Sequence, residues 1–197
     1  PNEIGLEIGL VLSRFFFNTE HLHFGFWPDD LSVNIDNLKK AQDLHSNQIL
    51  KSIPNDVKTI LDVGSGSGGL AEKLVGNGYK VECVSPSEYL SDAIEKKLKS
   101  SVVVHRSTFE KFEPQKKYDL VLFSESFQYV NINKTLNKLP DIIKDKGHLL
   151  ICDFFRQPGT GTKPLGGGHD WQIYQNNLGD HDFTIVKDID ITKETAR

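Results

Sequence analysis

Four glycines between residues 64 and 69 are the part of this sequence with the clearest potential for chemistry. They belong to the stretch Ile60–Gly69, ILDVGSGSGG, in which apolar residues lead through Asp62 into the glycines. Helix-forming residues, LAEKL, follow directly. A buried strand, a tight turn and a helix start leave backbone N–H groups free to bind polar or negatively charged ligand groups. The stretch is therefore expected to be a ligand-binding loop.

The spacing of the glycines allows a first interpretation as a dinucleotide site. Gly64, Gly66 and Gly69 satisfy the G-x-G-x-x-G pattern of that class. Such a site needs an acid at the end of the next strand to bind the ribose. The next predicted strand, Lys80–Val84, is followed by Ser85 instead. A nicotinamide oxidoreductase is therefore the less favoured interpretation.

The acid before the glycines favours a second interpretation. A carboxylate two residues before the first glycine can organise the loop and lie near the ammonium of an amino-acid-like ligand. The motif D-V-G-S-G-S-G resembles motif I of the class I S-adenosylmethionine-dependent methyltransferases. The resemblance extends over about residues 21–155 and implies S-adenosyl-L-methionine as cofactor and S-adenosyl-L-homocysteine as product. The cofactor-binding residues that it implies in this loop are Asp62, Gly64, Ser65, Gly66 and Gly68.

Strand and helix patterns alternate on both sides of this loop. Strands are expected at 57–63, 80–84, 102–105, 118–123 and 148–152, and helices at 33–52, 70–76, 87–99, 132–143 and 170–178. This alternation predicts an α/β fold, a Rossmann-like, mostly parallel sheet with helices on both faces. The resemblance implies the class I methyltransferase fold. A final antiparallel strand is not recognisable: either the chain is truncated after Arg197 or that strand is absent, and the resemblance favours truncation.

The chain is expected to form one methyltransferase domain, residues 1–197, with three parts. Residues 1–53 form an N-terminal helical lid, residues 54–155 the cofactor-binding core, and residues 156–197 a mobile acceptor-side loop, a helix and an edge strand at 183–190. Near the N-terminus, apolar residues at helical spacing are expected to pack into the core: Ile4, Ile8, Val11, Leu12 and Phe15.

Residues 21–30, HLHFGFWPDD, are called the lid segment below. They resemble the H-[YF]-G-[YF]-W stretch of tocopherol-type and cyclopropane-synthase-like methyltransferases, which folds over the bound cofactor. The resemblance implies that Trp27 belongs to the cofactor site and that the segment is a hydrophobic lid. No further metal ligands stand at suitable spacing from its two histidines, so no metal site is predicted.

The carboxyl ends of parallel strands meet at one edge of a sheet, where ligands bind. The resemblance assigns cofactor contacts to polar positions at these ends: Ser85, Pro86 and Ser87 near the ribose, Thr108, Phe109 and Glu110 near the adenine, and Ser124 near the methionine ammonium or the acceptor. Ser85 replaces the acid that usually binds both ribose hydroxyls, which leaves one hydrogen bond where two are expected.

Methyl transfer from a sulfonium needs alignment and exclusion of water, and it needs a base only where the acceptor atom is protonated. Two residues are candidates for that base. His169 follows three glycines on the acceptor side, and Glu125 follows the strand at 118–123. His21 and His23 are in reserve, whereas His45 is expected to be structural.

The charge and apolar composition of the sequence limit which kinds of binding partner are expected. Net charge is −4 without a basic stripe, so no nucleic acid partner is expected, and no apolar run is long enough for stable membrane insertion. The two cysteines both lie in predicted strands, which suits reduced thiols and a cytoplasmic location. The sequence does not define the oligomeric state.

The aromatic residues around the expected acceptor side favour a small, apolar or ring-containing methyl acceptor. They gather at 15–17, 24–27, 127, 129, 154–155 and 171. The leading hypothesis is S-adenosylmethionine-dependent methyl transfer to such a molecule by in-line displacement. Cyclopropane-synthase-like lipid modification and a non-catalytic module that binds S-adenosylmethionine are the alternatives.

Overall fold

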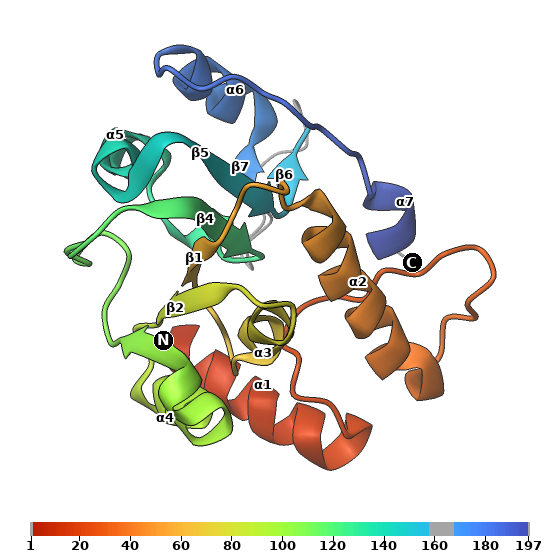
Figure 1. Ribbon diagram of the computed structural model, residues 1–197. Coiled ribbons are helices and arrows are strands. Elements are labelled where there is room, and N and C mark those ends of the chain that lie inside the picture. The colour runs from red at the N-terminus through yellow and green to blue at the C-terminus, as the bar shows by residue number, and fades with distance from the viewer. Residues whose placement is uncertain (1, 158–167, 197) are drawn as a thin grey trace.

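A five-stranded parallel sheet forms the centre of the molecule, and the computed structural model describes residues 2–157 and 168–196 (Figure 1). The strand order is β3–β2–β1–β4–β5. The strands are β1 (Thr59–Val63), β2 (Lys80–Val84), β3 (Val102–His105), β4 (Tyr118–Ser124) and β5 (Ile143–Cys152). A separate pair of short parallel strands, β6 (Phe155–Arg156) and β7 (His169–Asp170), follows β5.

Helices alternate with the strands as the sequence predicts. They are α1 (Asn2–Phe17), α2 (Leu38–Ser52), α3 (Gly69–Gly76), α4 (Glu88–Leu98), α5 (Ile132–Ile142), α6 (Trp171–Gly179) and α7 (Thr192–Thr195). Short 3-10 turns lie at Ile35–Asn37, Lys99–Ser101 and Phe127–Tyr129. The predicted α/β class, with a parallel sheet and helices on both faces, is confirmed.

Two hydrophobic clusters cover the two faces of the sheet. Successive side chains of a strand point to opposite faces, so Ile60 packs with α2, α3 and α4, whereas Leu61 packs with α5 and α6. In β4, Leu120 and Leu122 belong to the same cluster as Ile60, and Phe123 belongs to the same cluster as Leu61. This burial on both faces fixes β1 and β4 in the centre of the sheet, and their carboxyl ends therefore lie side by side.

Asp119 joins the starts of β1 and β4. Its Oδ2 atom accepts hydrogen bonds from the backbone N–H of Lys58 at 3.0 Å and of Thr59 at 2.8 Å, and from the Thr59 hydroxyl at 2.8 Å. Lys144 pairs with the other carboxylate oxygen at 2.8 Å. These bonds hold the two central strands in register, 60 residues apart in the chain.

The expectation that the apolar face of α1 packs into the core is wrong for most of that face. Ile8, Val11, Leu12 and Phe15 are between 45% and 80% exposed, whereas Leu10 is fully buried. The sequence has the apolar spacing of a helix, but this spacing alone does not determine which face of α1 packs against the rest of the protein. In the structure α1 packs through the Leu10 side.

The predicted edge strand at 183–190 is also corrected. The segment has no strand conformation, and its apolar residues Ile185, Val186 and Ile189 are 53% to 80% exposed. A strand needs a neighbour for its backbone groups, and this segment runs on to α7 instead (Figure 1). There the Glu194 carbonyl accepts a bond from the Trp27 N–H at 2.9 Å. Most of the predicted mobile loop, residues 158–167, lies outside the described residues.

Candidate active site

The glycine loop leaves β1 in the tight turn that its sequence predicts. Gly64, Gly66 and Gly68 have φ of 74°, 54° and 81°, the left-handed region that favours glycine. A Cβ atom at Gly64 would lie 2.5 Å from the Cβ of Ser126, so the loop and the end of β4 are in close contact there. The Ser65 hydroxyl donates to the Asp62 carbonyl at 2.8 Å and closes the turn.

Asp62 is a buried carboxylate with an unused oxygen. Its side chain is 1% exposed, and its Oδ2 atom has no hydrogen-bond partner among residues 2–157 and 168–196. Burial raises the pKa of this carboxyl to about 7. A buried acceptor without a donor is rare in proteins. An ammonium group placed against the loop would satisfy this oxygen, so Asp62 and the open left-handed turn fit the amino-acid part of S-adenosylmethionine.

The start of the lid segment covers the glycine loop. The Ser67 hydroxyl donates to the Glu20 carbonyl at 2.5 Å, and the Leu22 side chain lies 3.9 Å from where a Cβ at Gly66 would be. A Cβ atom at Gly69 would lie 2.9 Å from the His21 ring, so this ring also packs against the loop. The segment is therefore in the position expected of a lid.

Trp27 lies in a different environment from these residues. It is 6% exposed and packs with Leu31 and Ala41 in a small third hydrophobic cluster. A Cβ at Gly25 would lie 2.9 Å from the indole nitrogen, so this glycine allows the ring to pack closely. The described contacts of Trp27 are therefore with α2 and α7, and its assignment to the cofactor stays a prediction.

The end of β2 contains a carboxylate that the sequence did not indicate. The Ser87 hydroxyl donates to Glu7 of α1 at 2.9 Å and also accepts from the Leu90 N–H, which caps α4. Ser85 is buried at the end of the same strand, with Pro86 between the two serines. Glu7 thus brings an acid to the place where Ser85 replaces one. No local pattern connects residues that are 80 positions apart.

In the segment after β3, the backbone carbonyls of Thr108, Phe109 and Glu110 are already bonded within the protein. The Phe109 ring is buried against Phe123, with ring centroids 5.2 Å apart. Lys138 binds the carbonyl of Phe109 at 2.9 Å and that of Glu110 at 3.0 Å. The Thr108 carbonyl accepts the N–H of Phe112. The predicted adenine contacts of this segment stay predictions.

Glu125 follows Ser124 at the carboxyl end of β4 and has an unusual backbone. Its φ is 53°, a conformation that costs a non-glycine residue energy and is often kept for function. Its N–H donates to the Cys152 carbonyl at 2.8 Å, and its carboxylate accepts from the Phe24 N–H at 3.1 Å. The side chain is 12% exposed, and burial raises its pKa to about 7.

Two histidines lie beside Glu125. His45 Nε2 is 3.6 Å from Glu125 Oε1, and the rings of His45 and His23 stack with centroids 4.7 Å apart. Burial lowers the pKa of His23 to about 3 and that of His45 to about 4. One ligand atom from each of the three residues lies within 4.8 Å of the others. This group was not predicted from the sequence, because His45 lies among the apolar positions of α2 and was expected to be structural.

His169, the other candidate base, is bonded to the backbone. Its Nε2 atom lies 2.9 Å from the Phe127 carbonyl, so Nε2 carries the proton and Nδ1 is left as the basic nitrogen. Its ring packs edge-on to Phe127, which also contacts Phe155 and Tyr174. His169 is therefore held within an aromatic group at the acceptor side.

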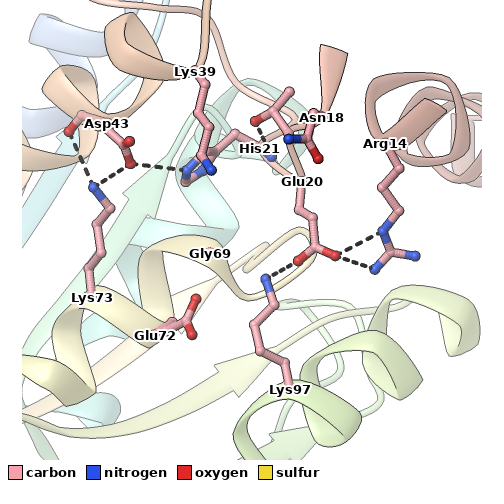
Figure 2. Close-up of a pocket in the computed structure, with 11 residues that line it drawn as sticks. Arg14, Asn18, Glu20, His21, Lys39, Asp43, Gly69, Glu72, Lys73 and Lys97 are labelled. Atoms are coloured by element: carbon pink, nitrogen blue, oxygen red, sulfur yellow. Dashed lines mark hydrogen bonds and ion pairs between the residues drawn. The ribbon is translucent and has the colours of Figure 1, made fainter. Parts of the chain in front are cut away.

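A polar hollow of about 390 Å³ lies beside the glycine loop, between α1, α2, α3 and α4 (Figure 2). Its cations are largely paired: Lys73 with Asp43 at 2.7 Å, and Arg14 and Lys97 with Glu20. His21 and Gly69 line the side next to the loop. These ion pairs connect α2 to α3, and they connect Glu20, directly before the lid segment, to α1 and α4.

No helix in residues 2–157 and 168–196 is long and apolar enough to cross a membrane.

A family model described as a methyltransferase domain matches residues 36–181. The chain belongs to this methyltransferase family. The match extends from before α2 to the end of α6, and it includes the glycine loop and the ends of all five strands.

The methyltransferase chain also has relatives among known proteins. It is 29% identical over 148 residues to the ubiquinone biosynthesis O-methyltransferase of Rickettsia bellii (strain OSU 85-389), a match covering 70% of this chain. The matched part spans 60% of that relative's length.

Solved structures show the same fold at low identity. A geranyl diphosphate C-methyltransferase from Streptomyces coelicolor A3(2), in complex with S-adenosyl-L-homocysteine, has a TM-score of 0.80 at 16% identity, covering 99% of this chain and 84% of that one. A cyclopropane synthase from Mycobacterium tuberculosis has a TM-score of 0.79 at 15% identity, covering 98% and 79%. The predicted class I methyltransferase fold, with S-adenosyl-L-methionine as cofactor, is confirmed.

Proposed function

We propose that this methyltransferase transfers the methyl group of S-adenosyl-L-methionine to a small apolar or ring-containing molecule, and that Glu125 accepts a proton from it. The observation that carries the proposal is a buried carboxylate at the carboxyl end of β4, beside aromatic side chains. The Phe24 ring packs edge-on to that of Phe154, with centroids 5.1 Å apart, while the Phe24 N–H binds Glu125.

The residues that hold the cofactor come from three elements. Gly64 and Gly66 hold the loop after β1 in the left-handed turn against which the methionine part would lie, and the Oδ2 atom of Asp62 would accept a bond from its ammonium. At the end of β2, Glu7 and Ser87 accept the ribose hydroxyls. The bound cofactor supplies a methyl group on a sulfonium centre. The task of the chain is to align the acceptor with that group and to exclude water.

The acceptor class is inferred from the aromatic group. The rings of Phe155, Trp171 and Tyr174 lie within 5.7 Å of one another, centroid to centroid. Phe155 and Tyr174 also contact Phe127, which packs edge-on to His169. Such walls suit an apolar or ring-containing molecule. The relative named for ubiquinone biosynthesis and the structural neighbour named for geranyl diphosphate also point to acceptors of this kind.

Glu125 is suited to remove a proton from a hydroxyl of the acceptor. Burial brings the pKa of its carboxyl to about 7, so the carboxylate is basic enough to accept a proton near neutral pH. His169, through its Nδ1 atom, is the second candidate. Because Glu125 must be ionised to act, turnover is expected to rise as pH increases through about 7.

The purified chain, given S-adenosyl-L-methionine, tests this with four acceptors: a catechol, a prenylated phenol, geranyl diphosphate and an unsaturated phospholipid. Formation of S-adenosyl-L-homocysteine and the mass of the product are measured. Glu125→Gln is expected to lower kcat about 100-fold or more and to remove the rise with pH. Exposed Glu113→Gln is the matched control and is expected to behave as wild type.

Each other result points to a different conclusion. A fall with His169→Gln and not with Glu125→Gln would transfer the role of base to His169. A cyclopropane product from the phospholipid would favour the lipid-modifying alternative. Cofactor binding without turnover on any acceptor would support the non-catalytic module.

A further inference from the structure

Three segments bring two histidines and a carboxylate together beside the end of β4. His23 belongs to the lid segment, His45 to α2, and Glu125 follows β4. One ring nitrogen from each histidine and one carboxylate oxygen lie within 4.8 Å of one another. Ligand atoms that share one ion lie up to about 4 Å apart, because each bond is about 2 Å long. Adjustments of less than about 1 Å therefore place all three on one ion.

The His23 ring has one nitrogen that could accept a metal ion. His23 Nδ1 lies 2.8 Å from the Phe24 carbonyl and donates to it, so Nε2 is the acceptor nitrogen. Nε2 lies 3.1 Å from His21 Nδ1 and 3.5 Å from the Ser46 hydroxyl, contacts that an ion on Nε2 would replace. A metal-binding histidine is commonly oriented by such a bond to a backbone carbonyl.

The protein alone does not satisfy the His45 ring. Its Nδ1 atom is buried and has no hydrogen-bond partner among the described residues. Its Nε2 atom is hydrogen-bonded to Cys152 Sγ at 3.5 Å and lies 3.6 Å from Glu125 Oε1, which is beyond a normal hydrogen bond. The ring is 2% exposed. Nε2 and the Glu125 carboxylate thus face each other at a distance that one ion can span with two bonds of about 2 Å.

From these contacts we infer that His23, His45 and Glu125 bind one divalent transition metal ion of the Zn²⁺ type. Two imidazoles and a carboxylate are a donor set that Zn²⁺ accepts in proteins, whereas Mg²⁺ and Ca²⁺ prefer oxygen ligands alone. His21 Nδ1 lies 3.1 Å from His23 Nε2, so a further nitrogen donor is next to the site.

The ion joins the lid segment to α2 and to the end of β4. The side chains of His45 and Glu125 are 2% and 12% exposed, so the site is largely buried, and its three protein ligands leave a coordination position open. The inference does not depend on methyl transfer. An ion on Glu125 also competes with the proton that the carboxylate accepts in the proposed reaction.

The test uses the full chain, stripped with a chelator, without cofactor or acceptor. Titration with Zn²⁺ is expected to load one ion per chain and to raise the midpoint of thermal unfolding. Titration with Co²⁺ is expected to give the visible absorption of a four- or five-coordinate ion. His23→Gln, His45→Gln and Glu125→Gln are each expected to weaken Zn²⁺ binding at least about tenfold.

His148→Gln is the matched control, because His148 also lies beside a carboxylate, Asp56 at 3.4 Å, and is expected to leave Zn²⁺ binding unchanged. The inference is overturned if the stripped wild-type chain binds no stoichiometric ion. It is also overturned if the three variants bind as tightly as wild type. Should a variant fail to fold, the Co²⁺ spectrum and the thermal shift of the wild-type chain decide. Lost methyl transfer with intact Zn²⁺ binding counts against the proposed function alone.

Discussion

Glu7 shows how a single side chain can replace a missing motif residue. The sequence has Ser85 where related enzymes have an acid for the ribose, and serine offers a weaker, uncharged contact. In the folded chain, the Glu7 carboxylate lies 2.9 Å from the Ser87 hydroxyl at the end of the same strand. We therefore predict that Glu7 of α1 supplies the acid for the ribose.

Glu7→Gln is expected to weaken S-adenosyl-L-methionine binding about tenfold, because a hydrogen bond to a charged group contributes about 1.5 kcal/mol or more. Isothermal titration calorimetry of the variant measures this directly. Exposed Glu113→Gln is the control for a general effect of lost charge. Unchanged affinity in Glu7→Gln would show that Ser85 and Ser87 bind the ribose without it.

The element that most clearly organises the site is the pair of central strands. β1 carries Asp62 and leads into the glycine loop, and β4 leads into Glu125. At the opposite ends of these strands, Asp119 ties β4 to the residues that begin β1. The register between the strands therefore sets the distance between the cofactor loop and Glu125.

Asp119→Ala is expected to lower the free energy of unfolding by about 2 kcal/mol, because it leaves the partly buried N–H and hydroxyl of Thr59 and the exposed N–H of Lys58 without their acceptor. Urea denaturation monitored by circular dichroism measures the change. Asp145→Ala, an exposed acid on β5, is the control and is expected to have little effect. A small loss in Asp119→Ala, equal to that of the control, would contradict the proposed tie.

At the scale of the whole molecule, the lid segment, α1 and the glycine loop form one covered region at the carboxyl edge of the sheet. Ser67 binds the Glu20 carbonyl, and Leu22 lies over Gly66. A ligand that fits this region connects parts of the chain that are far apart in sequence. Binding is therefore expected to stabilise the molecule as a unit.

S-adenosyl-L-methionine at about 100 times its Kd is expected to raise the free energy of unfolding by about 2.7 kcal/mol, whereas NAD has no effect. Gly66→Val is expected to abolish the gain, because a side chain at φ 54° is strained and fills the space between the loop and Leu22. Gly76→Val, a glycine with open space around it, is the control. Thermal unfolding with each ligand measures the difference. A gain with NAD alone would contradict the cofactor assignment.

Much of this protein follows from local patterns. Apolar runs bounded by glycine and polar turns located the five strands, and the glycine spacing after β1 located the cofactor loop. Those features depend on residues that are close in the sequence, so they can be predicted from the sequence alone. The predicted burial of the apolar face of α1 and the predicted strand at 183–190 were wrong, because both depend on which other elements pack against these segments. The spacing of apolar residues indicates whether a segment is a helix or a strand, but it does not indicate which other element the segment packs against.

Sequence alone therefore determined the fold class and the tight glycine turn after β1, since both arise from short-range preferences of the backbone, and the motif in that turn carried the resemblance to the family. Tertiary structure alone decided that Glu7 lies at Ser87 and that His23 and His45 meet Glu125. Those contacts join positions from 22 to 102 residues apart, and only the packing of the helices on the sheet brings them into one place.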